Sequence, residues 1–429
     1  MTSPGSLARQ TTWLLLERGF SILLGLIGFV LISRELGPES LGRFGLAMGA
    51  ATALSMIATL GLETHLTSQL TLRKQDSSRL IGAGLMLQSI TLVVLIALMM
   101  ALLHWSGRSD LRAPLMLAAA VAVMNSAWVW ECQLLARQRL LALCGQRLAC
   151  SVALIAAIGM LAAGEGASES MFMMAFLGQA TLRLLLAMVL SGGTRMVWHQ
   201  DSCRDAGSLL PAAKTLALGI AAVAAYSQLD RFALVALAGE YQAGLYLAAA
   251  RLSEGLQFIP LTIANAYVPR LAELSRSDPE AERRLLRQLF DVSTALAYIA
   301  ALSLCLTAPW LIPWLYGSSY AETVTVLQLH VWSNLMVFLG VISGRWMMVH
   351  GWHHLYFLRS LLGIAVHLAA LFSLVPALGA IGAAASAIAA QIAVVLVFDA
   401  LYPETRPALH HKWRALITPQ LPRALIDRR

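Results

Sequence analysis

Charge is scarce in this sequence. Only 13% of its 429 residues are charged, whereas 58% are hydrophobic and the mean hydropathy is +0.70. Soluble globular proteins carry about 25% charged residues, so this composition excludes an ordinary soluble domain. A charged side chain at the centre of a bilayer helix costs roughly 2.5–3.5 kcal/mol, and a chain solvated by lipid therefore keeps its charges for the loops. The sequence predicts an integral membrane protein.

Lysine and cysteine are also rare, and common catalytic motifs are missing. Lys74, Lys214 and Lys412 are the only lysines, so the formal charge of +8 comes from arginine. Membrane orientation explains that bias, and we expect no nucleic-acid partner. The five cysteines lack the paired short spacing of a metal or redox site. The sequence contains no glycine-rich phosphate loop, His-Glu metal motif or nucleophile elbow, and we predict neither a metal site nor a bound cofactor.

Long apolar runs recur along the chain. A bilayer span needs about 20 mostly apolar residues, and twelve such runs predict transmembrane helices at residues 12–33, 41–62, 81–103, 113–136, 146–163, 170–190, 213–238, 242–265, 291–312, 323–347, 355–375 and 378–400. The remaining segments are each too short to hold a soluble catalytic domain. We therefore expect a transporter rather than an enzyme.

Arginine placement orients these spans. If the N-terminus is cytoplasmic, only four basic residues fall on the outer side: Arg34, Arg43, Arg108 and Arg112. Four more lie inside spans (Arg18, Arg183, Arg231 and Arg251), and the remaining 23 of the 31 lysines and arginines fall on the inner side. Cytoplasmic loops carry this excess of positive charge. The pattern predicts a multi-pass membrane protein with both termini inside and a basic cytoplasmic tail at residues 401–429.

The longest internal loop, after Pro269, is predicted to contain a short helix. Asp278-Pro279 resembles a helix N-cap followed by a proline in the first turn. Three arginines at residues 283–287 then share a surface with neighbouring leucines. We expect a short helix on the cytoplasmic membrane surface, in contact with anionic lipid or with a protein partner.

The two halves of the chain share a hairpin motif. Gly37, Gly42 and Phe44 in the first predicted hairpin match Gly239, Gly244 and Tyr246 in the seventh-to-eighth hairpin, at a constant offset of 202 residues. Glycines in such positions permit tight turns. Because each hairpin opens a group of six spans, we predict an all-α protein of two six-helix bundles, residues 1–205 and 206–400, related by a parallel internal repeat. In such architectures substrate sites commonly lie near mid-membrane.

These hairpins also resemble those of a known family. The residues around Leu36-Gly37-Pro38-Glu39, those around Leu229-Asp230-Arg231, and Leu378-Gly379-Ala380 look like motifs of the polysaccharide-biosynthesis (O-antigen or exopolysaccharide) flippases of the multidrug/oligosaccharidyl-lipid/polysaccharide exporter superfamily. The resemblance implies that the protein flips an undecaprenyl-pyrophosphate-linked oligosaccharide from the inner to the outer leaflet by alternating access, for surface polysaccharide assembly. It also implies a location in the bacterial cytoplasmic (inner) membrane, with membrane lipid, the lipid-linked glycan and polysaccharide polymerase machinery as partners.

Ionisable residues near the second hairpin are candidates for the transport site. Asp230 and Arg231 lie roughly eight residues, or about 12 Å, from the outer end of their span. Arg251 lies at a similar depth in the next span, and Glu254 follows it by one turn. Antiparallel packing would bring Asp230 to Arg251. Either these groups form an ion-pair set that fixes helix packing, or an arginine binds phosphate.

The phosphate-binding interpretation assigns roles to individual residues. The headgroup phosphate and sugar would contact Arg18, Arg231, Arg251 and Tyr226. Asp230 and Glu254 would exchange a coupling cation, either a proton or sodium.

Several other polar residues in the predicted spans have structural interpretations. Arg18, Ser21, Gly25 and Gly28 share one helix face, which is either a cavity wall or a close-packing surface with Arg18 snorkelling to the interface. Glu17 points about 100° away from Arg18, and we expect it to face the interface. Glu131 and Arg183 are predicted to form a structural pair. The histidines 350, 353 and 354 are predicted to lie in a hydrated interfacial loop.

Three functional alternatives remain open. A lipid II flippase and a cation-coupled drug exporter belong to the same superfamily, but a drug site would favour acids and aromatics over arginines. A membrane-embedded polysaccharide polymerase or ligase is an alternative of another class. Such enzymes generally place catalytic groups on a large outer loop, and no predicted outer loop is long.

Overall fold

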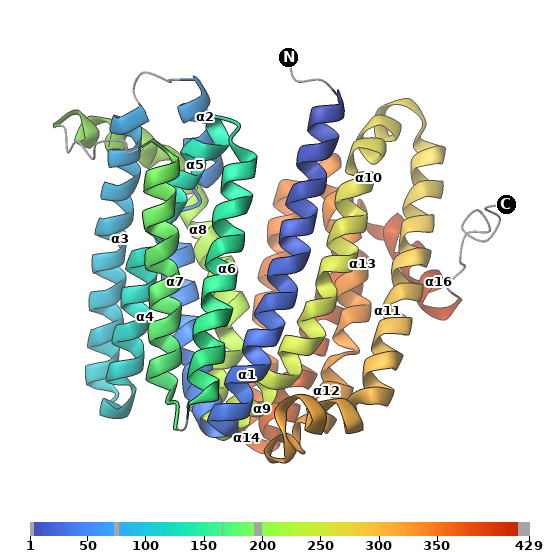
Figure 1. Ribbon diagram of the computed structural model, residues 1–429. Coiled ribbons are helices and arrows are strands. Elements are labelled where there is room, and N and C mark those ends of the chain that lie inside the picture. Colours follow the sequence, from blue (N-terminus) through green and yellow to red (C-terminus); the bar gives the residue numbers. More distant parts are fainter. Residues whose placement is uncertain (1–3, 73–76, 165, 193–199, 419–429) are drawn as a thin grey trace. The chain divides into compact units, whose positions relative to one another are not determined.

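Helices make up every regular element in the part of the chain that the structure describes. The computed structural model describes residues 4–72, 77–164, 166–192 and 200–418 (Figure 1), and no strand occurs among them. The chain divides into two compact units, Met1–Phe232 and Ala233–Arg429. The all-α class expected from the sequence is confirmed.

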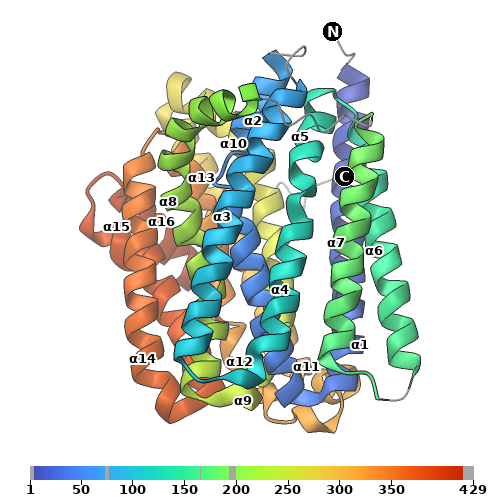
Figure 2. The same ribbon diagram turned by 90° about the vertical axis from the view of Figure 1, so that its left-hand side faces the viewer.

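Unit 1 contains long helices that run side by side (Figure 2). Within it, α1 packs along α4 and α6, and α6 packs against α7. Its helices are α1 (Pro4–Ala58), α2 (Glu63–Leu72), α3 (Ser77–Trp105), α4 (Arg112–Met124), α5 (Trp128–Ala136), α6 (Leu140–Ala163), α7 (Glu169–Leu190) and most of α8 (Gln200–Leu237). Short 3₁₀ turns precede α4 (Ser109–Leu111) and join α4 to α5 (Asn125–Ala127).

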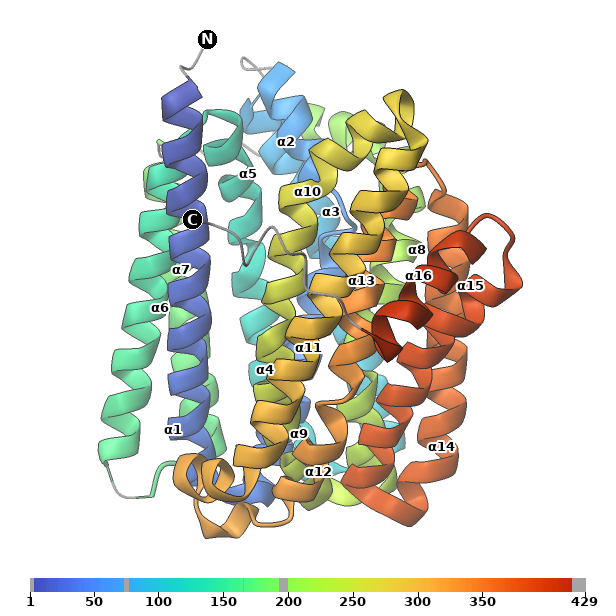
Figure 3. The same ribbon diagram turned by 90° about the vertical axis from the view of Figure 1, so that its right-hand side faces the viewer.

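Unit 2 is also built of helices, and a short helix lies near its C-terminus (Figure 3). Its helices are α9 (Gly239–Glu254), α10 (Phe258–Ser277), α11 (Pro279–Tyr316), α12 (Thr323–His330), α13 (Ser333–Val349), α14 (His353–Ile392), α15 (Phe398–Leu401) and α16 (Arg406–Ile417). A π-helical turn, Ala393–Val397, joins α14 to α15, and 3₁₀ turns lie at Gly255–Gln257 and Ser318–Tyr320.

Eight helical stretches in the described residues are long and apolar enough to cross a membrane. Two of them, Glu17–Ala58 and His353–Leu401, each cover two of the predicted spans. The predicted runs at 213–238 and 242–265 fall on α8 and on α9 with α10. The structure thus confirms a polytopic helical protein. The count of twelve spans and the cytoplasmic placement of both termini stay predictions.

Single glycines make the sharpest reversals between helices. Gly37 within α1 has φ +68°, and Gly239 at the start of α9 has φ +87°, which confirms the tight turns predicted at the two repeated positions. Gly379 reverses α14 in the same way, with φ +56°. Residues with a Cβ rarely adopt positive φ, whereas glycine does so without steric cost. Pro38 follows the first of these glycines, where its fixed φ suits the first turn of the next helix segment.

The Gly379 turn is closed by a side chain from α9. The Oε1 atom of Gln242 accepts a hydrogen bond of 3.0 Å from the backbone N–H of Ala380. A Cβ atom at position 379 would approach that same oxygen to 2.5 Å. Glycine therefore serves two purposes here, since it adopts the required φ and leaves room for the capping amide.

The long helix α11 corrects one prediction. Asp278 does cap its N-terminus, because the carboxylate accepts hydrogen bonds from the backbone N–H groups of Glu280 and Ala281, and Pro279 is the first helical residue. The prediction that a short, separate surface helix begins here is wrong, however. α11 continues without a break to Tyr316, because no glycine or proline interrupts residues 280–308.

Each unit contains apolar clusters of buried side chains. In unit 1, leucines of α2 and α3 pack against Trp128, Val129 and Trp130 of α5, and the Trp128 indole donates to Gln88 at 2.8 Å. In unit 2, Phe290 of α11 and Phe398 of α15 belong to a core that also contains Ala408 and Ala415 of α16. The cores fix α5 and α16 in position.

Lys412 docks α16 through a buried ion pair. Its ammonium group lies 2.6 Å from Asp399 Oδ2 and 3.1 Å from the carbonyl oxygen of Val395, and its side chain is 0% exposed. Burial lowers the pKa of Lys412 from 10.5 to about 8, although the Asp399 carboxylate opposes the shift. The sequence analysis assigned this lysine to the predicted basic tail. Residues 419–429 of that tail lie outside the described part of the chain.

Gly379→Ala is expected to destabilise unit 2. Strained backbone at positive φ costs about 1–3 kcal/mol, and the new methyl group would displace the Gln242 cap. Gly159→Ala is the matched control, because a Cβ at this position in α6 would meet nothing within 4 Å. Thermal unfolding of the detergent-purified protein should show a lower midpoint for Gly379→Ala alone. Equal midpoints in both variants would contradict the role of the turn.

The Lys412–Asp399 pair should give the protein a pH-dependent stability. The folded-state pKa of about 8 lies below the unfolded value of 10.5, so between these pH values the unfolded chain binds more protons. The free energy of unfolding therefore rises as pH increases from about 8 to about 10.5. The double variant Asp399→Leu, Lys412→Met should unfold with a flatter pH dependence over that range. An unchanged slope would show that the pair does not carry this effect.

Candidate functional site

Arg231 is held on α8 against the second half of α1. Its Nη1 donates a hydrogen bond of 2.6 Å to the Oε1 of Gln228, which lies three residues earlier on the same helix and is buried. A Cβ at Gly49 of α1 would lie 3.2 Å from that Oε1 and 3.3 Å from Arg231 Cδ. The absence of a side chain at Gly49 thus lets both α8 side chains pack against α1.

Tyr226 and Asp230 lie on the same helix as Arg231. They are four residues apart, which places them one above the other on one side of α8, and both are partly exposed. Arg231 lies eight residues before Gly239, which is about 12 Å along the helix axis. The centre of a hydrocarbon core about 30 Å thick is about 15 Å from either side. If Gly239 lies at the outer membrane surface, as the sequence predicts, Asp230 and Arg231 lie close to mid-membrane.

Arg18 lies on an exposed side of α1, whereas its neighbour Glu17 is buried. Glu17 is 8% exposed and accepts a hydrogen bond of 3.0 Å from Ser21, so the expectation that it faces the interface is wrong. Further along α1, α6 packs closely at Gly28, where a Cβ would meet Ile155 and Ile158 at 2.8 and 3.2 Å. The predicted small face is therefore a packing surface at Gly28.

Arg251 and Glu254 lie three residues apart on α9, and both are exposed. The rest of that helix is buried from Ala243 to Ala250. The Tyr316 hydroxyl donates to the Ala248 carbonyl at 3.3 Å, one turn before Arg251. Arg251 lies twelve residues after Gly239, or about 18 Å along the axis. It too would therefore lie near the middle of the membrane.

The candidate residues belong to different units. Arg18, Tyr226, Asp230 and Arg231 lie in unit 1, and Arg251 and Glu254 lie in unit 2. The predicted pair of Asp230 with Arg251 stays a prediction, as do the substrate and cation roles of all six residues. Gln228 is a partner that the sequence analysis missed, although its position three residues before Arg231 was a usable signal.

Glu131 holds two arginines in unit 1, which confirms the predicted pair with Arg183. The Arg183 guanidinium donates two hydrogen bonds to the Glu131 carboxylate, at 2.6 and 2.9 Å, and Arg147 adds a third at 2.8 Å. Gln146 donates to the Arg183 carbonyl at 2.9 Å. Two-point contact between a guanidinium and a carboxylate is strong and directional. These hydrogen bonds join α5, α6 and α7, so the charges of Glu131, Arg147 and Arg183 are explained by helix packing in unit 1.

A second cluster in unit 2 was not predicted. Glu282 is 6% exposed, and its Oε1 accepts from the Trp346 indole at 3.1 Å and lies 2.8 Å from His350 Nε2. The His350 ring stacks on Trp352 with centroids 4.7 Å apart. Of the predicted hydrated loop, only His350 lies in the turn between α13 and α14, and it contacts Glu282, whereas His353 and His354 are exposed residues at the start of α14. Sequence distance hid this cluster, because Glu282 lies 68 residues before His350.

Comparison by sequence connects the chain to one family. The profile of the family described as polysaccharide biosynthesis protein matches residues 7–275, which is more than half of the chain. The matched range contains both glycine hairpins and all six candidate residues. No curated protein matches the sequence.

Comparison by structure connects the chain to transporters. The lipid II flippase MurJ, in an inward closed conformation, superposes with a TM-score of 0.69 at 14% identity over 96% of this chain and 92% of that one. An inward-facing multidrug resistance MATE family transporter of the MOP superfamily gives a TM-score of 0.70 at 13% identity over 93% and 96%. At these identities the similarity shows the fold alone.

Glu131→Gln is expected to destabilise unit 1. The change leaves Arg147 and Arg183 without their charge partner, and hydrogen bonds to charged groups are worth about 1.5–3 kcal/mol each. Glu273→Gln is the control, because Glu273 is 63% exposed in its pair with Arg270 and such surface pairs contribute about 0–1 kcal/mol. Chemical denaturation in detergent would measure both changes. An equal, small loss in the two variants would contradict a structural role for Glu131.

Proposed function

The chain belongs to the polysaccharide biosynthesis protein family, and from that membership we propose that it flips a polyprenyl-pyrophosphate-linked oligosaccharide across the cytoplasmic membrane. The direction is from the inner to the outer leaflet, by alternating access, for assembly of a surface polysaccharide. The fold supports the proposal, because a lipid flippase and a multidrug transporter share it.

The substrate's chemistry explains why a protein is required. Transfer of an unpaired charge or an unbonded hydroxyl into hydrocarbon is costly, and a sugar-bearing pyrophosphate carries many such groups. The polyprenyl chain, in contrast, is apolar and stays in the hydrocarbon of the membrane. The protein therefore needs polar and cationic contacts for the headgroup only.

Arginine placement is the observation that carries the proposal. Arg231 and Arg251 lie about 12 and 18 Å along their helices from Gly239, at depths where an arginine is costly unless it has a polar partner. The guanidinium fork matches two phosphate oxygens at once. We assign Arg231, Arg251 and Arg18 to the pyrophosphate and Tyr226 to the sugar or phosphate.

Two carboxylates complete the proposed machinery. Asp230 and Glu254 lie one residue before Arg231 and three residues after Arg251, so a cation bound at either carboxylate would alter the field at its arginine. Exchange of a proton or sodium ion at these positions would couple transport to an ion gradient. The proposal includes twelve spans in two six-helix bundles, with both termini cytoplasmic.

Transport of lipid II is the second candidate, because the chain superposes on the lipid II flippase MurJ. Both substrates carry a polyprenyl pyrophosphate, so arginine variants do not separate them. The attached glycan does. A purified protein that moves a lipid-linked oligosaccharide but not lipid II would support the first candidate, and the opposite selectivity would support the second.

Arg251→Ala is expected to lower export of the surface glycan by about tenfold or more, because a charge-assisted phosphate contact is worth about 1.5–3 kcal/mol. Export would be measured by surface labelling in cells whose only copy is the variant. Arg251→Lys should retain part of the activity, since it keeps the charge but loses the fork. Arg270→Ala is the control, because Arg270 is 57% exposed and pairs with Glu273.

The protein level has to be measured in the same cells. Arg251→Ala should be as abundant in the membrane as the wild type, since its side chain is exposed. Normal export by an abundant Arg251→Ala protein would remove Arg251 from the headgroup site.

A further inference from the structure

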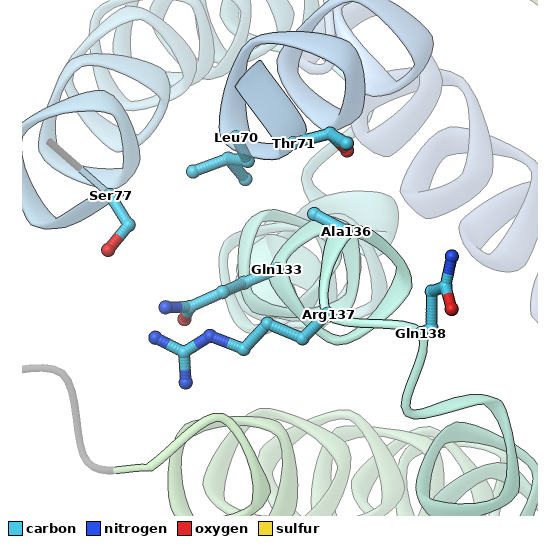
Figure 4. A pocket seen from close by; sticks show the side chains of 7 residues that line it. All are labelled: Leu70, Thr71, Ser77, Gln133, Ala136, Arg137 and Gln138. Carbon is cyan, nitrogen blue, oxygen red and sulfur yellow. The ribbon is translucent and has the colours of Figure 1, made fainter. Parts of the chain in front are cut away.

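A polar pocket lies at one end of unit 1, where α2, α3 and α5 meet (Figure 4). Its volume is about 480 Å³. Leu70 and Thr71 of α2 form one wall, Ser77 begins α3 on another, and Gln133 and Arg137 come from the end of α5. Pockets of about 300–1,000 Å³ hold small organic ligands. The space is therefore large enough for a phosphorylated headgroup.

Arg137 is fixed at the rim of this pocket. Its backbone N–H bonds to the Gln133 carbonyl at 3.0 Å, and the next residue, Gln138, turns the chain with φ +56°. One guanidinium nitrogen, Nη1, donates to the Ser191 carbonyl at the end of α7, at 2.7 Å. A guanidinium has five N–H donors, so this anchor leaves donors for another acceptor. The anchor holds the side chain in place before any ligand arrives.

The polar side chains converge on one side of the pocket. In Figure 4 the Arg137 guanidinium and the Gln133 amide extend in the same direction, toward the space that the Ser77 hydroxyl also faces. Gln133 is 1% exposed, so its amide is held by the packing of α5. Ser77 begins a helix, whose first amide groups carry partial positive charge.

The charge of the lining favours an anion. Arg137 is a cation, and the lining residues that the structure describes include no carboxylate. Guanidinium, amide and hydroxyl donors together match the oxygens of a phosphate. We propose that this pocket binds the phosphate group of a small anionic molecule, with Arg137 as the charged contact and Ser77 and Gln133 as neutral donors.

A membrane lipid is the source of phosphate that the surroundings favour. Leu72 follows Thr71 at the end of α2 and is 76% exposed, which suits a contact with acyl chains beside the pocket. With the orientation predicted from arginine placement, this end of unit 1 faces the cytoplasm. The cytoplasmic leaflet is rich in anionic lipids. A soluble phosphate compound is the other source that the same chemistry permits.

The inference does not depend on the identity of the transported glycan. The pocket residues come from α2, α3 and α5, whereas the proposed headgroup arginines lie on α1, α8 and α9. A failure to bind phosphate in this pocket would leave the proposed flippase activity intact. Loss of flippase activity in Arg251→Ala would likewise say nothing about the pocket.

Native mass spectrometry of the full-length protein in a non-ionic detergent tests the proposal. Phosphatidylglycerol, phosphatidylcholine, glycerol 3-phosphate and inorganic phosphate would be titrated separately. Wild-type protein should retain phosphatidylglycerol at least about tenfold more tightly than the neutral phosphatidylcholine. Arg137→Gln should lower the affinity for phosphatidylglycerol by about tenfold or more, as expected for one lost charge-assisted contact.

Arg139→Gln is the matched control. Arg139 also donates to the end of α7, to the Leu190 carbonyl at 3.2 Å, but it does not line the pocket. Its loss should change the affinity by less than about twofold. Ser77→Phe supplies a second test if Arg137→Gln does not fold, because it removes a hydroxyl and fills the pocket while it leaves the Arg137 anchor unchanged. Ser77→Phe should also lower the affinity by about tenfold.

The outcomes separate the two phosphate sources. Loss of phosphatidylglycerol in Arg137→Gln and Ser77→Phe, with retention in Arg139→Gln, supports a lipid site. The same variant pattern with glycerol 3-phosphate or inorganic phosphate, but not with the lipid, supports the phosphate chemistry and assigns a soluble ligand. Equal binding of all four probes, or equal affinity in all variants, would overturn the proposal.

Discussion

A charged side chain in hydrocarbon needs a counter-charge, a hydrogen-bond acceptor or water. This constraint explains the contacts of the basic residues in the helices. Glu131 binds Arg147 and Arg183 within unit 1. In unit 2 the buried Arg359 and Lys412 donate to the carbonyl oxygens of Val394 and Val395 in the π-helical turn, at 2.9 and 3.1 Å. All four have structural partners that account for them. Arg18 and Arg251, two of the arginines that we assign to the headgroup, lie on exposed helix faces.

Local signals in the sequence predicted the reversals of the chain well. Gly37 and Gly239 were identified as turns from their spacing alone, and both have positive φ. Asp278 was identified as a cap because a short acceptor side chain before proline suits only the start of a helix. These features are determined by a few consecutive residues, so one sequence suffices to find them. The same reasoning failed at the end of this helix, because the arginines after Asp278 are compatible with both a surface helix and a long one.

Contacts between distant segments could not be predicted in the same way. From the sequence, Lys412 is interpreted as a solvated tail residue. Its partner, Asp399, lies 13 residues earlier, and only the fold brings the two side chains together. Nothing in the sequence around Gly49 predicts that Arg231 packs against it. These partners depend on how helices pack, which a single sequence does not specify. The pair of Glu131 and Arg183 was predictable because an acid and a base in otherwise apolar helices have few other partners.

Direct measurement of lipid transfer tests the central claim that arginines in the membrane helices bind the headgroup. Purified protein would be reconstituted into liposomes that carry a polyprenyl-pyrophosphate-linked oligosaccharide, and the glycan that reaches the opposite leaflet would be detected by lectin binding. The wild type should accelerate transfer. The triple variant of Arg18, Arg231 and Arg251 to alanine should insert equally well and transfer at the rate of empty liposomes. Transfer by the triple variant at the wild-type rate would contradict the account.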